Sequence, residues 1–120
     1  MLNLPLPVRI FLCTQPADMR RSFDGLAGMV RQFLGADPLS GHLFVFRSKR
    51  GDRLKLLYWM GDGPAIWYRR LEEGTFRFPE ATDASHGVEM RAADFAMLLD
   101  GVDLSSVKRR KRYRRPGVPA

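Results

Sequence analysis

The sequence has a single cysteine, Cys13, and only two histidines, His42 and His86. One cysteine excludes an intramolecular disulfide, so we expect a protein of the reducing cytoplasm, with Cys13 buried as a small hydrophobe. With so few nitrogen and sulfur ligands, a zinc site would need carboxylates from unlinked places. We therefore expect no metal, and we interpret both histidines, which lie beside glycines, as loop residues.

The sequence also lacks a long apolar run. No stretch approaches the roughly 20 apolar residues of a transmembrane helix. The N-terminal residues are apolar, but Pro5, Pro7 and Arg9 interrupt them, and there is neither a basic leader nor a clear small-residue cleavage site. We expect neither a signal peptide nor a membrane partner.

Groups that could make or break bonds are scarce. Asp52, Asp62 and Glu72 are evenly spaced, which is compatible with a metal site, but they fall in separate predicted turns. The adjacent Ser85 and His86 offer no nucleophile–base geometry, because neighbouring residues seldom face each other correctly. Tyr113 among arginines is similar to the nucleophile of tyrosine recombinases, but those enzymes need a large helical domain. The sequence predicts no enzyme, no catalytic residues and no cofactor.

Positive charge is abundant and lies at one end. The net charge is +7, and residues 108–115 hold seven of the 20 basic residues, while the other 13 are balanced by 13 acidic residues. This pattern favours a polyanion partner. We expect seven cations to contact phosphates: Lys108, Arg109, Arg110, Lys111, Arg112, Arg114 and Arg115. Tyr113, which lies among them, could stack on an exposed base. The alternatives are a solubilising tail or one that binds an acidic patch on a protein.

Hydrophobic periodicity predicts one α+β domain over residues 1–104, followed by a flexible basic tail over 105–120. Residues 80–90 are expected to be irregular. The predicted strands are 8–13, 43–47, 53–60, 65–71 and 75–78, and the predicted helices are about 17–34 and 91–100. Because the turns from 43 onward are short, the last four strands should form an antiparallel meander, packed against the first helix.

A second basic cluster surrounds the turn at residues 48–52. Its members crowd nine residues and are opposed only by Asp52: Arg47, Lys49, Arg50, Arg53 and Lys55. A two-stranded ribbon with a basic tip can enter a DNA groove, and on such strands Arg47, Arg53 and Lys55 could share one face. The alternative is that the charges only protect a sheet edge against aggregation.

Aromatic residues are concentrated in the predicted strands, where alternation divides them between the two faces of the sheet: Phe44, Phe46, Tyr58, Trp59, Trp67, Tyr68, Phe76 and Phe78. One face should pack on the first helix. We expect the second helix or a second copy of the chain to cover the other. Aromatics left exposed there, beside Arg69, Arg70 and Arg77, could stack bases or anchor a protein.

Several long blocks of the sequence closely resemble a known family. They are DMRRSFDGL (18–26), GHLFVFRSKRGDRLKLLYW (41–59), GDG (61–63) and YRRLEEGTFRFP (68–79). The resemblance is to the second-frame accessory protein of the insertion sequence sixty-six family, also called TnpB or Orf2-like and unrelated to the RNA-guided nuclease TnpB. The family often has an acidic residue where this chain has Met60, so no carboxylate role can be carried to that position.

The resemblance implies a protein needed for transposition, whereas the catalytic transposase is encoded by another frame of the same element. We therefore expect a non-catalytic accessory protein that binds DNA at the element ends and assists the transposase. The alternative is a protein–protein adaptor of the transposase complex that does not bind DNA itself. A third possibility is an RNA-binding regulator. The expected partners are DNA, the transposase and other products of the element, and a second copy of the chain.

Overall fold

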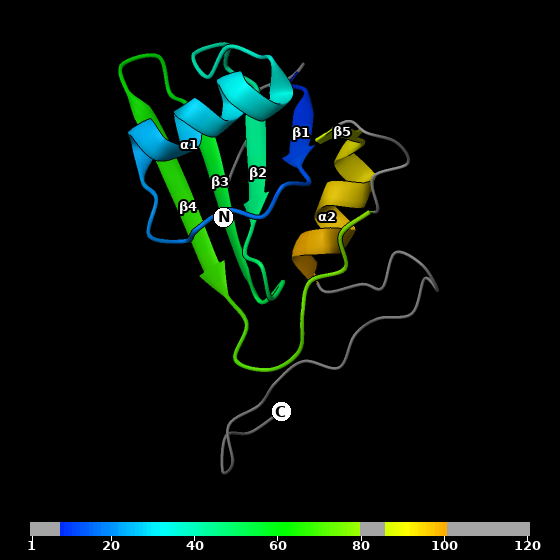
Figure 1. The fold of residues 1–120 in the computed structure, drawn as a ribbon. Helices are drawn as coiled ribbons and strands as arrows, with labels where there is room; N and C mark the ends of the chain where they lie inside the picture. The colour runs from blue at the N-terminus through cyan, green and yellow to red at the C-terminus, as the bar shows by residue number, and fades with distance from the viewer. Residues whose placement is uncertain (1–7, 80–85, 101–120) are drawn as a thin grey trace.

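The computed structural model describes residues 8–79 and 86–100. They form a five-stranded mixed sheet with a helix on each face (Figure 1). The strands are β1 (Ile10–Cys13), β2 (Leu43–Arg47), β3 (Arg53–Trp59), β4 (Pro64–Arg70) and β5 (Gly87–Met90). Their order across the sheet is β4–β3–β2–β1–β5. β1 and β2 are parallel, and the other neighbours are antiparallel.

The α+β class is confirmed, and so are three strands of the predicted meander, β2, β3 and β4. The turn over 61–63 determines the register of β3 and β4: the Met60 N–H donates to the Gly63 carbonyl at 2.8 Å, and Trp59 lies opposite Pro64. Pro64 begins an edge strand, where a missing N–H costs no ladder bond.

The prediction of a fourth meander strand at residues 75–78 is wrong. After β4 the chain leaves the sheet and runs past its lower end towards the second helix (Figure 1). Phe76 still makes one backbone hydrogen bond, to the carbonyl of Gly51 at 2.8 Å, and its side chain is buried. The alternating pattern therefore reflects burial of one side of an irregular segment.

The opposite edge of the sheet also differs from the prediction. β5 falls in the stretch expected to be irregular, and it pairs with β1. The Thr14 N–H continues this pairing by donating to the carbonyl of His86. Gly87 suits this strand, because a Cβ there would lie 2.4 Å from the end of the Leu34 side chain.

The first helix is shorter than the predicted 17–34. α1 (Phe23–Met29) continues as a wider π-helical turn, η1 (Val30–Leu34), which ends at Gly35 with φ +58°. Asp18 forms a separate turn, in which its carboxylate accepts from the backbone and the guanidinium of Arg20. That hydrogen bonding holds the pKa of Asp18 well below its usual range.

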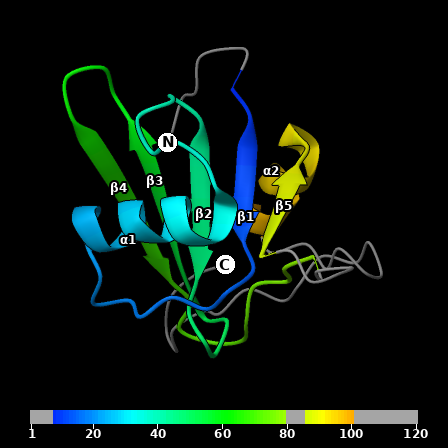
Figure 2. The ribbon, with the colours of Figure 1, turned by 45° about the horizontal axis from the view of Figure 1, so that its top comes forward.

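The two helices lie on opposite faces of the sheet (Figure 2). The predicted second helix is confirmed as α2 (Ala92–Asp100). Strand alternation sends side chains into two cores. On the α1 side these include Cys13, Leu26, Met29, Val30, Phe44, Phe46 and Leu57. On the α2 side they include Leu12, Val45, Leu54, Leu56, Phe76, Phe95 and Leu98. The proposed tail, 105–120, lies outside the described residues.

Candidate nucleic-acid interface

The turn between β2 and β3 is held by hydrogen bonds of its own. The Ser48 hydroxyl donates to the Asp52 carboxylate at 3.2 Å and accepts from the Arg53 N–H at 3.1 Å. The Ser48 N–H donates to the Arg53 carbonyl, and Gly51, at φ +78°, donates back to the Ser48 carbonyl. The positive φ explains the glycine, because a side chain there would be strained. Lys49 and Arg50 therefore project from an ordered turn.

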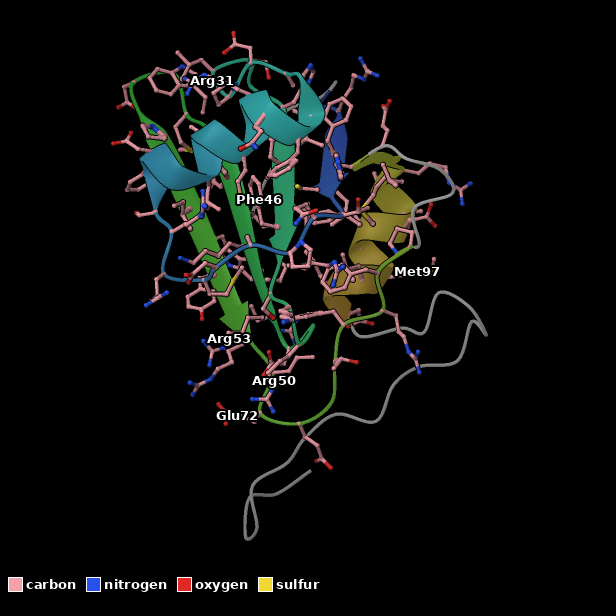
Figure 3. The ribbon with its side chains drawn as sticks, in the orientation of Figure 1. Arg31, Phe46, Arg50, Arg53, Glu72 and Met97 are labelled. Carbon is pink, nitrogen blue, oxygen red and sulfur yellow. The ribbon has the colours of Figure 1, made fainter. Side chains whose placement is uncertain are left out.

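Three of the five predicted cations at this turn have no acidic partner. Lys49 and Arg50 are exposed and Arg53 is half-buried, and their side chains make no hydrogen bond or ion pair with another described residue. Their charges remain available to an anion. Figure 3 shows Arg50 and Arg53 together at one end of the sheet, while Arg31 lies at the opposite end.

The other two cations are used inside the fold. Arg47 donates to the carbonyl of Thr14 at 3.0 and 3.2 Å, and its guanidinium lies 6.0 Å from the centre of the Phe78 ring. Lys55 is 8% exposed and donates to the carbonyl of Arg21 at 2.8 Å. These contacts leave both side chains less accessible to phosphate than the three unpaired cations.

The structure does not place Arg47, Arg53 and Lys55 on one face, as the sequence allowed, because Arg47 lies on the other side of the sheet. Arg47 lies opposite Leu54 in the ladder, so it points to the α2 side. Arg53 and Lys55 point to the α1 side. The sequence does not fix the side of Arg47, because a five-residue turn separates β2 from β3. The side on which Arg47 lies depends on which residue of β3 pairs with it, and that residue is Leu54.

The register adds Arg70, which lies directly opposite Arg53 on the same face. Among the described residues it forms one ion pair, with Glu72 at 3.3 Å, and both side chains are more than half exposed. Such exposed ion pairs contribute little to stability, so Glu72 does not tie up the charge of Arg70. The position of the Gly-Asp-Gly turn is the signal in the sequence that could have found this pairing, because it sets which residues of β3 and β4 face each other.

The predicted tail residues, 108–115, lie outside the described residues. The described chain ends with α2 near the basic turn, because Arg69, the neighbour of Arg70, donates to the carbonyl of Leu99. Figure 1 likewise shows the C-terminal end of α2 at the end of the sheet where the 48–52 turn lies.

The predicted aromatic set is largely covered. Phe44 and Phe46 pack under α1, and Tyr58, Trp67, Phe76 and Phe78 pack on the α2 side. On the α2 side the cover comes from side chains of α2, among them Phe95 and Leu98, and from the 71–79 segment, to which Phe76 and Phe78 themselves belong. Tyr68 differs, since it is 48% exposed.

Carboxylates and histidines do not gather into a cluster within 8–79 and 86–100. Asp52 and Glu72 lie at one end of the β3–β4 hairpin and Asp62 at the other. The His42 Nδ1 accepts from the backbone N–H of Arg9 at 3.1 Å, and the His86 ring contacts Phe33 edge-on. No group of three or more potential metal ligands occurs among these residues. No helix in the same ranges is long and apolar enough to cross a membrane.

Comparison with known proteins identifies the family. Residues 8–109 match the family described as IS66 Orf2 like protein. The chain is 43% identical to uncharacterized protein y4jC of Sinorhizobium fredii, over 91% of each chain. It is 36% identical to uncharacterized protein y4hO of the same organism, over 80% of this chain and 82% of that one. No solved structure matches. The chain belongs to the IS66 Orf2-like family of insertion-sequence accessory proteins.

Proposed function

We propose that this protein is a non-catalytic accessory of transposition that binds DNA through the turn at 48–52 and the basic tail at 108–115, and that assists a separate transposase. The observation that carries the proposal is the set of unpaired cations, Lys49, Arg50 and Arg53, on an ordered turn. Phosphate binding would use these charges, since neutralised phosphates release their condensed counterions.

The place where α2 ends supports joint action of the two basic segments. Residues 101–107 connect α2 to the tail, and seven residues span at most about 25 Å. A connection of this length allows the tail and the 48–52 turn to contact the same nucleic acid. Two linked weak sites act at high effective concentration, so together they would bind far more tightly than either alone.

The salt dependence of binding tests this proposal. With labelled duplex DNA and fluorescence anisotropy, the full chain should give a steep log–log slope, to which seven tail cations would contribute up to about −6. Replacing the seven basic residues of 108–115 with glutamine should remove most of that slope and most of the affinity. Replacing Lys49, Arg50 and Arg53 with alanine should reduce the slope by about 2 to 3.

Single-charge variants provide the control. Arg31→Ala and Arg50→Ala remove equal charge from opposite ends of the sheet (Figure 3), and only Arg50→Ala should weaken binding clearly. Equal affinity and slope for the full chain and the glutamine variant would rule out the tail. If no variant binds DNA but the protein co-purifies with the transposase, the adaptor function replaces this proposal.

A further inference from the structure

We infer that the α1-side face of the β3–β4 hairpin, beside the basic turn, binds unpaired nucleotides by stacking a base on Tyr68 and holding the adjoining phosphates with Arg53 and Arg70. We call these three residues the Tyr68 surface. The inference rests on the proposed nucleic-acid binding and specifies its ligand as a single-stranded segment.

The ladder brings these side chains together. Arg53 lies opposite Arg70, and Lys55 lies opposite Tyr68, so all four point to the same face. The Leu71 N–H donates to the carbonyl of Asp52 at 2.8 Å, which makes the next pair, Arg53 with Arg70, a non-hydrogen-bonded pair. In such pairs the side chains approach most closely.

Tyr68 is both exposed and held in place. The ring is 48% exposed, while the Lys55 ammonium lies 4.9 Å from its centre. Lys55 is itself fixed by its hydrogen bond to the Arg21 carbonyl. The ring therefore has a fixed cation on one side and accessible surface for a ligand. Proteins that bind single strands combine such aromatic rings with cations that follow the backbone.

The two arginines favour an anion at this place. Like charges directly opposite each other on a sheet are unfavourable. The exposed Arg70–Glu72 pair, at 3.3 Å, offsets little of this repulsion, and Arg53 has no acidic partner among the described residues. A phosphate between the two guanidinium groups would relieve the repulsion, and the cations of the 48–52 turn extend the same positive region.

The stacking requirement distinguishes single strands from duplex. A base in a duplex has both faces covered by its neighbours, whereas an unpaired base presents a free face to Tyr68. Duplex DNA would contact only the cations.

The test measures the affinity of the full chain for labelled single-stranded DNA, single-stranded RNA of the same sequence and duplex DNA, at one salt concentration. Tyr68→Ala should weaken single-strand binding about 5- to 100-fold and duplex binding less than about 2-fold. Tyr68→Phe, which keeps the aromatic ring, should bind single strands about as tightly as the parent chain. Arg53→Ala and Arg70→Ala should weaken both. Met60→Ala, an exposed apolar side chain at the other end of the hairpin, is the matched control.

Photo-crosslinking of the unaltered protein to a bromouracil-containing strand provides a readout that does not depend on a variant's folding, and the crosslinked peptide should contain Tyr68. Equal binding of single strands by the parent chain and Tyr68→Ala, with crosslinks elsewhere, would overturn the Tyr68 surface while leaving the proposed function intact. Failure of the full chain to bind any nucleic acid would overturn both. A Tyr68-dependent preference for RNA over DNA would support the surface and identify RNA as its ligand.

Discussion

Lys55 illustrates how a residue's partners decide its role. In the sequence it resembles the other cations near the turn, but the structure buries it between the Arg21 carbonyl and the Tyr68 ring. The partner carbonyl comes from a segment 34 residues earlier in the chain. Spacing within the hairpin could predict that Lys49 and Arg50 are exposed at the turn, but it could not reveal this distant acceptor.

Replacing Lys55 with alanine is therefore expected to destabilise the fold. The free energy of unfolding should fall by about 1–3 kcal/mol, because the change removes a charge-assisted hydrogen bond and a packed aliphatic stem. Urea denaturation measures the loss. Lys49→Ala, at an exposed position of the turn, should change stability by less than about 0.5 kcal/mol. Similar stabilities for the two variants would show that Lys55 is not a structural residue.

At the scale of elements, local signals predicted the β2–β3–β4 meander and α2, whereas pairings between distant segments were missed. The parallel pairing of β1 with β2 depends on the path of the chain through α1. β5 has only four residues, of which Val88 and Met90 provide the apolar pattern, and it becomes a strand because β1 offers an unpaired edge. Sequence periodicity contains no information about that edge.

A salt bridge joins Glu89 of this edge strand to Arg9, the residue just before β1. Glu89 accepts from the Arg9 guanidinium at 2.6 and 3.0 Å, and this hydrogen bonding lowers the pKa of Glu89. A carboxyl whose pKa is lower in the folded state stabilises the fold above its unfolded pKa, about 4.3, and loses that contribution as the pH falls through its folded pKa. The effect should be modest, since both side chains are about half exposed.

The Glu89→Gln variant should therefore be slightly less stable than the parent at pH 7, and the difference should shrink as the pH falls from about 5 towards 3. Thermal unfolding midpoints across that range provide the measurement. Glu73→Gln is the control, because Glu73 is exposed and its side chain makes no bond to another described residue. A stability difference for Glu89→Gln that does not change with pH would show that the ion pair contributes nothing.

At the scale of the whole molecule, the sheet is a single layer shared by two cores. Neighbouring residues of β2 point to opposite sides, with Phe44 under α1 and Val45 under α2. Loss of either helix would expose one face of the same strands. Because the remaining sheet would then be covered on one side only, we expect the two cores to unfold together.

This cooperativity can be tested by truncating one buried leucine in each core. Leu26→Ala in α1 and Leu98→Ala in α2 should each lower the free energy of unfolding by about 2–5 kcal/mol, since both side chains are fully buried. Far-ultraviolet circular dichroism and tryptophan fluorescence should report the same urea midpoint for each variant, because Trp59 and Trp67 lie on opposite faces of the hairpin. A separate unfolding transition at lower urea, seen in Leu98→Ala alone, would show that α2 unfolds independently of the sheet. The attachment of the tail to the sheet through α2 would then be weaker than the joint action of turn and tail requires.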